Sequence, residues 1–362
     1  MKNNCYLSII KQVDTSFDLN YYIYTKIKKR NIEKVSSPLK VGLKITGKCH
    51  FRCQYCFVNK EKAYLSIENT RKIIEKLPQL PFEIYITGGE ATLNPDFEPI
   101  IEYLYSLGVL IRLHTTGVIS DRTKQYIINN TYKFSSIQIS IDSIKNFNKF
   151  RPNYVDKNSL LQIVKFVNEC KNNGYNNFSI NVVLSKLNID ELEDIISFGI
   201  EKGIYYFRLS PIFTTNRELM ADDERYIEMY RDIIYKYSGR GAVFLSDPLC
   251  HPWSYIIKHS TASCSTPLFC PAQKTEFEVD MFGDVYPCPF LYDSYHKMGN
   301  MLTDDFEDIW NSGVDELNVT AWSKNEKCQS CILFEDCGGG CYALAYASGK
   351  EYDLRCSLHE SQ

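Results

Sequence analysis

The sequence lacks a long apolar run and lacks an excess of charge of either sign. No stretch approaches the roughly 20 apolar residues that a membrane span needs, and the first residues, MKNNCYLSIIKQVD, have neither the apolar core nor the cleavage site of a signal peptide. The formal net charge is −3, and apart from a short cluster at 26–30 the basic residues are scattered. These absences predict a cytoplasmic protein with no membrane partner and no nucleic acid partner.

The chain also lacks internal repeats and low-complexity tracts, and its 362 residues are long enough for two domains. Short β-branched runs alternate with amphipathic segments from residue 41 to 210. This rhythm predicts consecutive parallel strand–helix units. The expected strands are 41–46, 83–87, 109–115, 137–142, 178–184 and 204–210.

Helices are expected between these strands. Ser66 is a plausible cap for the first of them, and Gly108, Gly174 and Gly203 stand where left-handed C-terminal caps are expected. The expected helices are 66–77, 96–107, 160–173 and 190–202. Six such units curl toward a barrel without completing eight, so the predicted fold class is α/β with a partial (β/α)6 barrel, and ligands should lie at the carboxyl ends of its strands.

The rhythm ends after residue 211 and gives way to a charged helical stretch at 222–237 and then a cysteine-rich region. The predicted organisation is an N-terminal extension (1–40), the partial barrel (41–215), a connecting helical region (216–262) and a small second domain (263–362). Few periodic apolar segments occur in the second domain, which suggests that metal binding contributes to its folding.

Fourteen cysteines are poorly explained by disulfides in a reducing compartment, so metal is the better explanation. Three of them, Cys49, Cys53 and Cys56, follow the first expected strand at positions i, i+4 and i+7. A structural zinc site would need a fourth ligand, for which His50 is the close candidate. Three thiolates on a four-iron cluster would instead leave one iron open to a cofactor or substrate.

This CxxxCxxC pattern, with the aromatic Tyr55 before its last cysteine, resembles the signature of the radical S-adenosylmethionine superfamily. The resemblance implies that the three cysteines hold a [4Fe-4S] cluster whose open iron binds S-adenosylmethionine. It also implies that reductive cleavage of S-adenosylmethionine gives a 5′-deoxyadenosyl radical, which abstracts hydrogen from a substrate.

Further contacts to S-adenosylmethionine are implied by the same resemblance. Gly88, Gly89 and Glu90 look like the family's GGE motif, in which the carboxylate helps to hold the methionine ammonium. Thr116 stands where relatives often have asparagine, so a polar role for it does not follow. The resemblance implies contacts from Ser140 and Asp142 after the fourth strand, from Arg151, and from Leu209 on the sixth strand, although burial would explain Leu209 equally well.

Eight further cysteines form the second group, enough for two fully ligated four-iron clusters, although a zinc ribbon uses similar CxxC pairs. The spacing from Cys270 to Cys356 resembles the SPASM domain found after the barrel in some radical enzymes. The resemblance implies three [4Fe-4S] clusters in all, one catalytic and two auxiliary. It assigns Cys264, Cys270, Cys288 and Cys341 to the nearer auxiliary cluster and Cys328, Cys331, Cys337 and Cys356 to the farther one.

Relatives with this pattern modify ribosomally made peptides or oxidise an alcohol carbon. The predicted substrate is a ribosomally synthesised peptide, which would be crosslinked or oxidised, with dehydrogenation of a small-molecule alcohol as the alternative. The electron donor is expected to be a flavodoxin or ferredoxin. Sulfatase-maturing relatives carry a basic aspartate where this chain has Pro289, so that activity is disfavoured, although Asp293 could substitute. A non-catalytic iron–sulfur electron carrier or zinc scaffold is the alternative of another class. No catalytic acid or base is assigned.

Overall fold

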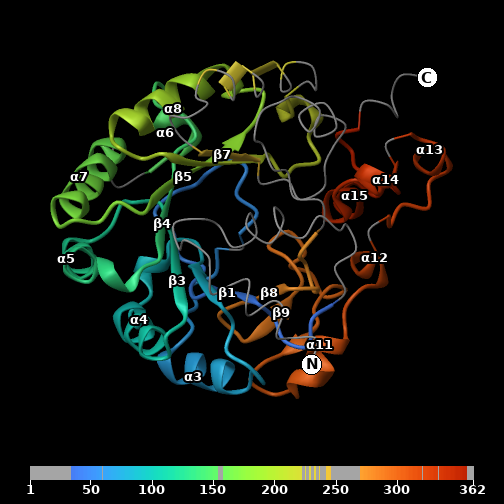
Figure 1. Cartoon of the computed structure of the whole chain (residues 1–362), viewed down its shortest axis with the longest axis horizontal. Helices are drawn as coiled ribbons and strands as arrows, with labels where there is room; N and C mark the ends of the chain where they lie inside the picture. Colours follow the sequence, from blue (N-terminus) through green and yellow to red (C-terminus); the bar gives the residue numbers. More distant parts are fainter. Residues whose placement is uncertain are drawn as a thin grey trace.

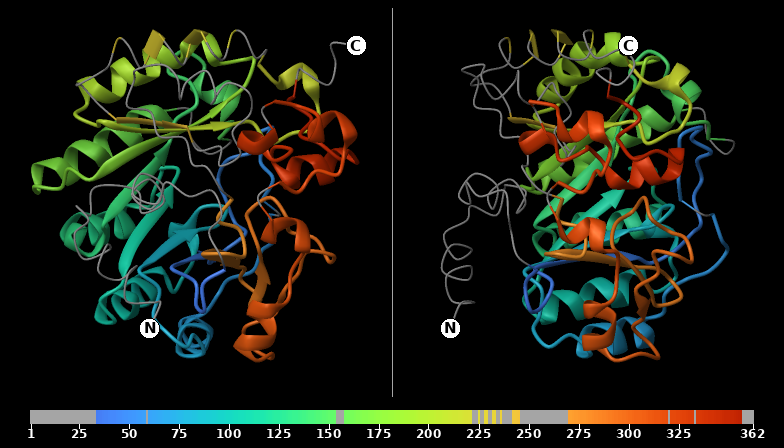
Figure 2. Two further views of the ribbon diagram at one scale, coloured as in Figure 1. Left: turned by 45° about the vertical axis from the view of Figure 1, so that its right-hand side comes forward. Right: turned by 90° about the vertical axis from the view of Figure 1, so that its right-hand side faces the viewer.

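The computed structural model describes residues 34–58, 60–153, 158–221, 242–245, 270–319, 321–332 and 334–356, together with 225, 228–229, 232–233 and 236. Figures 1 and 2 show a curved sheet with helices on its outer side, and a C-terminal region, residues 270–356, that lies at one edge of the sheet and across its open side. Among the helices so described, none is long and apolar enough to cross a membrane.

Within the described residues, the sheet has ten strands in the order β10-β9-β8-β1-β2-β3-β4-β5-β6-β7. Strands β1 to β7 pair in parallel, β8 pairs in parallel with β1, and β9 and β10 add an antiparallel edge. The strands are β1 (Lys40–Lys44), β2 (Glu83–Thr87), β3 (Leu110–Thr115), β4 (Ser136–Ser140), β5 (Phe178–Leu184), β6 (Tyr206–Pro211), β7 (Ala242–Leu245), β8 (Glu276–Val279), β9 (Asp284–Tyr286) and β10 (Gly299–Asn300).

Helices cover the outer side of the sheet, and short helices also occur in the C-terminal region (Figure 1). The outer helices are α3 (Ile67–Glu75), α4 (Phe97–Ser106), α5 (Asp121–Asn129), α6 (Phe147–Phe150), α7 (Ser159–Asn172) and α8 (Leu192–Glu201). Short 3₁₀ turns are η1 (Ala91–Leu93), η2 (Thr131–Lys133), η3 (Ile189–Glu191) and η4 (Arg217–Leu219). The C-terminal region contains α11 (Phe306–Asn311), α12 (Asp315–Asn318), α13 (Glu326–Gln329), α14 (Phe334–Cys337) and α15 (Tyr342–Ser348).

The main hydrophobic core lies between the sheet and the outer helices. Successive side chains of a strand point to opposite faces, so each strand divides its residues between the core and the inner face. On β4, for example, Ile137 and Ile139 are fully buried in the core, whereas Gln138 and Ser140 line a cavity on the inner face. The same alternation on neighbouring strands gives the inner face its polar character.

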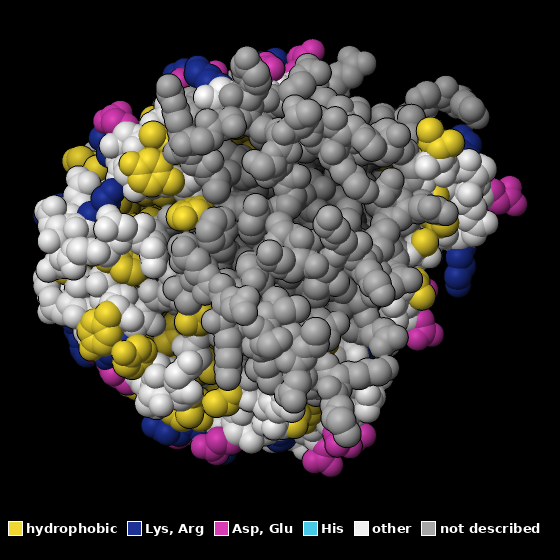
Figure 3. Space-filling view, in the orientation of Figure 1, with side chains coloured by type: hydrophobic (Ala, Val, Ile, Leu, Met, Phe, Trp, Pro, Cys, Tyr) yellow, Lys and Arg dark blue, Asp and Glu magenta, His cyan; other side chains and the backbone are white. Residues whose placement is uncertain are grey.

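Charged side chains are distributed around the described surface. In the space-filling view, basic and acidic groups of the described residues alternate along the rim of the molecule (Figure 3). Several of them pair across neighbouring elements, as Lys145 does with Asp194 at 2.6 Å. The mixed surface agrees with the scattered charges of the sequence.

The six predicted parallel strands are confirmed as β1 to β6, with ends that differ from the prediction by at most two residues. The predicted cap of the first helix is also confirmed, because the Ser66 hydroxyl accepts a hydrogen bond from the backbone N–H of Asn69. Gly108, Gly174 and Gly203 have φ angles of +75°, +86° and +69°, as left-handed caps require.

The sheet extends beyond the six predicted strands at both edges. Strand β7 falls in the predicted connecting region and pairs with β6, and β8 falls in the predicted second domain and aligns Glu276 with Lys40 of β1. The predicted boundaries at 215 and 262 are therefore not edges of the sheet. Local periodicity could not reveal this, because the new strands are only four residues long and β8 pairs across more than 200 residues.

Two other predictions differ from the structure or lie partly outside it. Helix α5 is absent from the predicted elements, because its sequence DRTKQYIIN buries only Ile127 and Ile128 and so has a weak apolar stripe. The described residues of the predicted helix at 222–237 are helical, and the rest of that segment lies outside the described residues. The N-terminal extension is described only from residue 34 onward.

Candidate functional site

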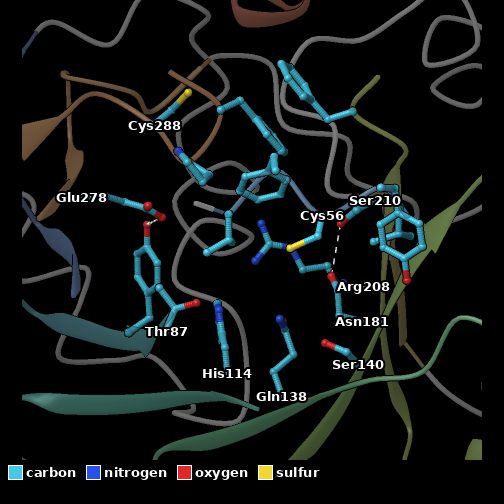
Figure 4. A pocket seen from close by; sticks show the side chains of 18 of the residues that line it. Cys56, Thr87, His114, Gln138, Ser140, Asn181, Arg208, Ser210, Glu278 and Cys288 are labelled. Atoms are coloured by element: carbon cyan, nitrogen blue, oxygen red, sulfur yellow. Dashed lines mark hydrogen bonds between the residues drawn. The ribbon is translucent and has the colours of Figure 1, made fainter. Parts of the chain in front are cut away.

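A cavity of about 430 Å³ lies between the inner face of the sheet and the C-terminal region. This volume is within the range of small-ligand sites. Thr87, Ser140 and Ser210 reach it from the carboxyl ends of their strands, where the sequence predicts the site. Figure 4 shows side chains that point into it from the strands and from the C-terminal region. The strand residues labelled there are Thr87, His114, Gln138, Ser140, Asn181, Arg208, Ser210 and Glu278.

Cys49, Cys53 and Cys56 lie in the loop that follows β1, and all three line the cavity. They are thiols rather than disulfides. Burial raises the pKa of Cys49 to about 11, and burial also raises the pKa of Cys53, which the charge of Arg151 opposes. Thiols become ligands when a metal displaces their protons, so three thiols on one loop suit an iron–sulfur cluster.

As they stand, the described residues contain no group of three or more His, Cys, Asp or Glu that could hold a metal ion. The fit to a cluster therefore depends on the chemistry and placement of the donors. Soft thiol donors that share one cavity wall are the donor set that iron–sulfur clusters use.

Gly88 and Gly89 pack directly against the backbone that leads into the cysteine loop. A Cβ at Gly88 would lie 2.4 Å from the carbonyl oxygen of Thr46, and one at Gly89 would lie 2.3 Å from that of Lys48. The Gly89 N–H donates to Thr46 O at 2.8 Å, and the Glu90 N–H donates to Lys48 O at 2.7 Å. Both glycines also line the cavity. Their small size therefore lets the backbone before the cysteine loop pack against them and leaves room for a ligand.

The Glu90 carboxylate holds two strand ends together and does not line the cavity. It is buried, and its oxygens accept hydrogen bonds from the backbone N–H and hydroxyl of Thr92, from the hydroxyl of Thr115, and from the N–H and hydroxyl of Thr116, at 2.6–3.2 Å. Polar groups of the chain itself bind both oxygens, and the predicted contact of Glu90 with the methionine ammonium stays a prediction. Thr116, to which sequence reasoning assigned no role, is one of these partners.

Asp142 also lies off the cavity, at the centre of a buried network. Its Oδ2 accepts hydrogen bonds from the Tyr55 hydroxyl and from Arg151 Nε, the latter at 2.5 Å, and its Oδ1 accepts the Val183 N–H at 2.7 Å. The carboxylate is fully buried within this network, and its predicted contact with the cofactor stays a prediction. Ser140, Tyr55 and Arg151 do line the cavity, as predicted for cofactor-contacting residues.

Leu209 faces the core instead of the cavity. It is fully buried in the main hydrophobic core, whereas its neighbours Arg208 and Ser210 line the cavity. Strand alternation explains the difference, because a residue between two inward-pointing side chains points outward. Burial, the alternative considered for this leucine, is what the structure shows.

In the C-terminal region, Cys270, Cys288 and Cys341 line the cavity. Burial raises the pKa of Cys288 well above its ordinary value, and the nearby Cys270 and Cys341 contribute to the increase. These three therefore lie near one another, as their predicted assignment to one cluster requires. Their predicted partner, Cys264, lies outside the described residues.

The predicted ligands of the farther cluster also lie near one another. Burial raises the pKa of Cys337 to about 12, with contributions from Asp353, Cys356 and Cys328. Cys331 follows Cys328 by one turn, and its N–H donates to Cys328 O at 3.0 Å. The assignment of individual cysteines to clusters stays a prediction.

Sequence reasoning missed the buried carboxylate of Glu278 on β8. It lines the cavity, and its two oxygens accept hydrogen bonds from the hydroxyls of Tyr85 and, at 2.6 Å, of Tyr292. Among the described residues it forms no ion pair. Glu278 alternates with the buried Phe277 and Val279, a pattern typical of a strand. The pattern was not recognised from sequence because it lies within the cysteine-rich region.

Asp293, the base considered from sequence, lies elsewhere. Its carboxylate binds His296 Nδ1 at 2.7 Å and is not among the groups that line the cavity. The structure therefore places it away from a substrate in the cavity.

Known families match this architecture. Residues 43–199 match the family model of the radical SAM superfamily, and residues 270–332 match that of SPASM, an iron–sulfur cluster-binding domain. Mycofactocin maturase MftC of Mycolicibacterium smegmatis is 24% identical over 328 residues, which cover 88% of this chain and 82% of that protein. An S-adenosylmethionine-dependent nucleotide dehydratase of Selenomonas ruminantium is 26% identical over 221 residues, or 54% of this chain and 78% of that protein.

Solved structures share the fold. Streptococcus suis SuiB bound to its precursor peptide SuiA has a TM-score of 0.70 at 20% identity, covering 93% of this chain and 78% of that chain. The enzyme anSMEcpe with bound AdoMet has a TM-score of 0.70 at 18% identity, covering 89% of this chain and 91% of that chain. A partial barrel with three cysteines after its first strand, followed by a cysteine-rich region, defines a class of radical enzymes. The chain belongs to the radical SAM superfamily and carries a SPASM domain.

Proposed function

We propose that this enzyme oxidises a peptide by radical chemistry, with its catalytic cluster on Cys49, Cys53 and Cys56. The observation that carries this proposal is the shared cavity. The catalytic cysteines line one part of it, and Cys288 and Cys341 of the C-terminal region line another. A substrate bound in this cavity is therefore in reach of both groups of cysteines.

Cofactor binding is assigned to residues that line the cavity near the cysteine loop. When bound, the cluster and S-adenosylmethionine supply the 5′-deoxyadenosyl radical that abstracts hydrogen. Glu90 and Asp142 act indirectly, because their hydrogen bonds hold the strand ends and loops that present the lining residues. The lining residues placed to contact S-adenosylmethionine are Tyr55, Gly88, Gly89, Ser140 and Arg151.

The C-terminal region is proposed to hold two auxiliary [4Fe-4S] clusters, which brings the total to three. The eight cysteines assigned from sequence supply the ligands, and a flavodoxin or ferredoxin supplies electrons. This arrangement favours oxidation, since the substrate carbon must lose an electron as well as a hydrogen atom.

Glu278 is proposed to take the proton released in that oxidation. After hydrogen abstraction from a carbon that bears an O–H, N–H or S–H group, loss of that proton and of one electron to an iron–sulfur acceptor leaves a double bond. Each carboxylate oxygen of Glu278 accepts one phenolic hydrogen bond, so a further lone pair on each stays available. Burial raises the pKa of Glu278, which favours proton uptake.

A peptide is preferred over a small-molecule alcohol as the substrate. MftC is named a maturase, and SuiB and anSMEcpe structures were solved with peptides bound. The cavity is lined by cysteines and by polar side chains of the strands, and this lining suits a polar segment of a peptide substrate. A small-molecule alcohol is the alternative substrate. One relative, the nucleotide dehydratase, is named for a small-molecule substrate and supports this alternative.

Co-expression with short peptides encoded beside the gene is expected to give a peptide lighter by two hydrogens, detected by mass spectrometry. With a deuterated form of that peptide, deuterium is expected in 5′-deoxyadenosine. A Glu278→Gln variant is expected to transfer the deuterium but to lose most of the product. Deuterium transfer from a deuterated small-molecule extract, and none from peptides, would contradict the peptide assignment.

A further inference from the structure

Arg151 makes contacts within the chain that a role in cofactor binding does not explain. Its guanidinium is buried, its Nε donates to Asp142 Oδ2 at 2.5 Å, and its Nη1 donates to the Cys53 sulfur at 3.9 Å. The guanidinium carbon also lies 5.9 Å from the centre of the Tyr55 ring. A charged donor therefore lies beside one of the three cysteines of the loop.

The surroundings of Arg151 fix this position from several sides. Asp142 is fully buried and is itself held by the Tyr55 hydroxyl and the Val183 N–H. The segment after Arg151 is tied to the cysteine loop, because the Arg52 N–H donates to Pro152 O at 3.0 Å and Phe51 bridges to Asn153. The arginine and Cys53 thus belong to one connected unit.

We infer that Arg151 is a positioning residue that raises the reduction potential of the catalytic cluster through its hydrogen bond to the Cys53 sulfur. This inference rests on the proposed function for the assignment of the cluster to Cys49, Cys53 and Cys56. Reduction adds negative charge that the thiolate sulfurs share, and a buried cation and hydrogen bond at one sulfur stabilise that charge. Asp142 and Tyr55 keep the guanidinium in place.

The test is a redox titration followed by electron paramagnetic resonance, without S-adenosylmethionine. The resonance signal of the catalytic cluster is the one that disappears when Cys49, Cys53 and Cys56 are all replaced by alanine. In Arg151→Gln the ratio of reduced to oxidised cluster at a fixed potential is expected to fall about tenfold, which corresponds to about 59 mV, because a charge-assisted hydrogen bond is lost. Arg151→Lys, which keeps the charge but not the planar donor, should shift the ratio less and in the same direction.

Arg52→Gln is the matched control. Arg52 lies in the same loop, but its Nη1 binds the carbonyl oxygens of Cys49 and Phe51 and no sulfur. Its replacement should leave the potential unchanged.

An unchanged potential in Arg151→Gln, with iron content intact, would overturn the inference and leave the proposed function standing. A drop in S-adenosylmethionine affinity with no change in potential would overturn it as well. If the Arg151→Gln variant takes up no iron, the Arg151→Lys variant decides. A reduction potential of its catalytic cluster equal to or above that of the wild type would overturn the inference. Absence of any reducible cluster in the wild type would instead overturn the proposed function.

Discussion

Replacement of Cys49, Cys53 and Cys56 together by alanine is expected to lower the iron content of the anaerobically reconstituted protein from about twelve to about eight per chain. The three thiols share one loop after β1 and line one cavity, and the C-terminal cysteines are carried by a separate part of the chain. Loss of the first set should therefore leave the second set loaded. Iron and acid-labile sulfide assays on both proteins measure the difference.

Cys170→Ala is the control for the loss of a buried thiol. Cys170 lies on α7 in the main core and is not among the cavity-lining residues. This variant should keep about twelve irons. About four irons in the wild type, or zinc in place of iron, would contradict the assignment of two auxiliary clusters and remove the proposed electron acceptor.

Replacement of Asp353 by alanine is expected to destabilise the C-terminal region and to cost it both auxiliary clusters. Asp353 is buried, and its Oδ2 accepts the Cys341 N–H at 2.8 Å and Arg355 Nη2 at 2.5 Å. It also packs on Gly340, where an added Cβ would lie 2.2 Å from the Asp353 Cβ. One carboxylate thus joins the turn before Cys341 to the segment that carries Cys356.

Removal of one partner of a buried ion pair costs about 3–5 kcal/mol, because the remaining charge is left without compensation. Iron content should fall from about twelve toward about four, since cluster binding and folding of this region are coupled. Denaturant unfolding and iron assays measure both effects. Asp308→Ala, at an exposed position on α11, should change neither. Full iron content and unchanged stability in Asp353→Ala would contradict the role assigned to this carboxylate.

Local sequence patterns were enough to predict the strands that build the barrel and the position of the site. The six predicted strands follow from alternating apolar residues, and the cysteine spacing placed three thiols at the end of the first strand. Both signals depend on residues close together in the sequence. Strand β8 pairs with β1 from the far end of the chain, and no local pattern carries that information.

Side-chain partners were the other part that sequence could not supply. The sequence could not show that the carboxylates of Glu90 and Asp142, which are predicted cofactor contacts, are bound by groups from other strands and loops. The direction of Leu209 depends on which face of β6 meets the helices. Glu278 became visible as a cavity residue only when β8 was placed beside β1.

Cleavage of S-adenosylmethionine by the reduced, reconstituted protein is the decisive reaction for the proposed radical chemistry. We expect 5′-deoxyadenosine from the wild type, measured by liquid chromatography and mass spectrometry, and none above background from the variant that lacks Cys49, Cys53 and Cys56. A wild-type protein with a reduced four-iron cluster on these cysteines and bound S-adenosylmethionine, but no 5′-deoxyadenosine, would contradict the proposal.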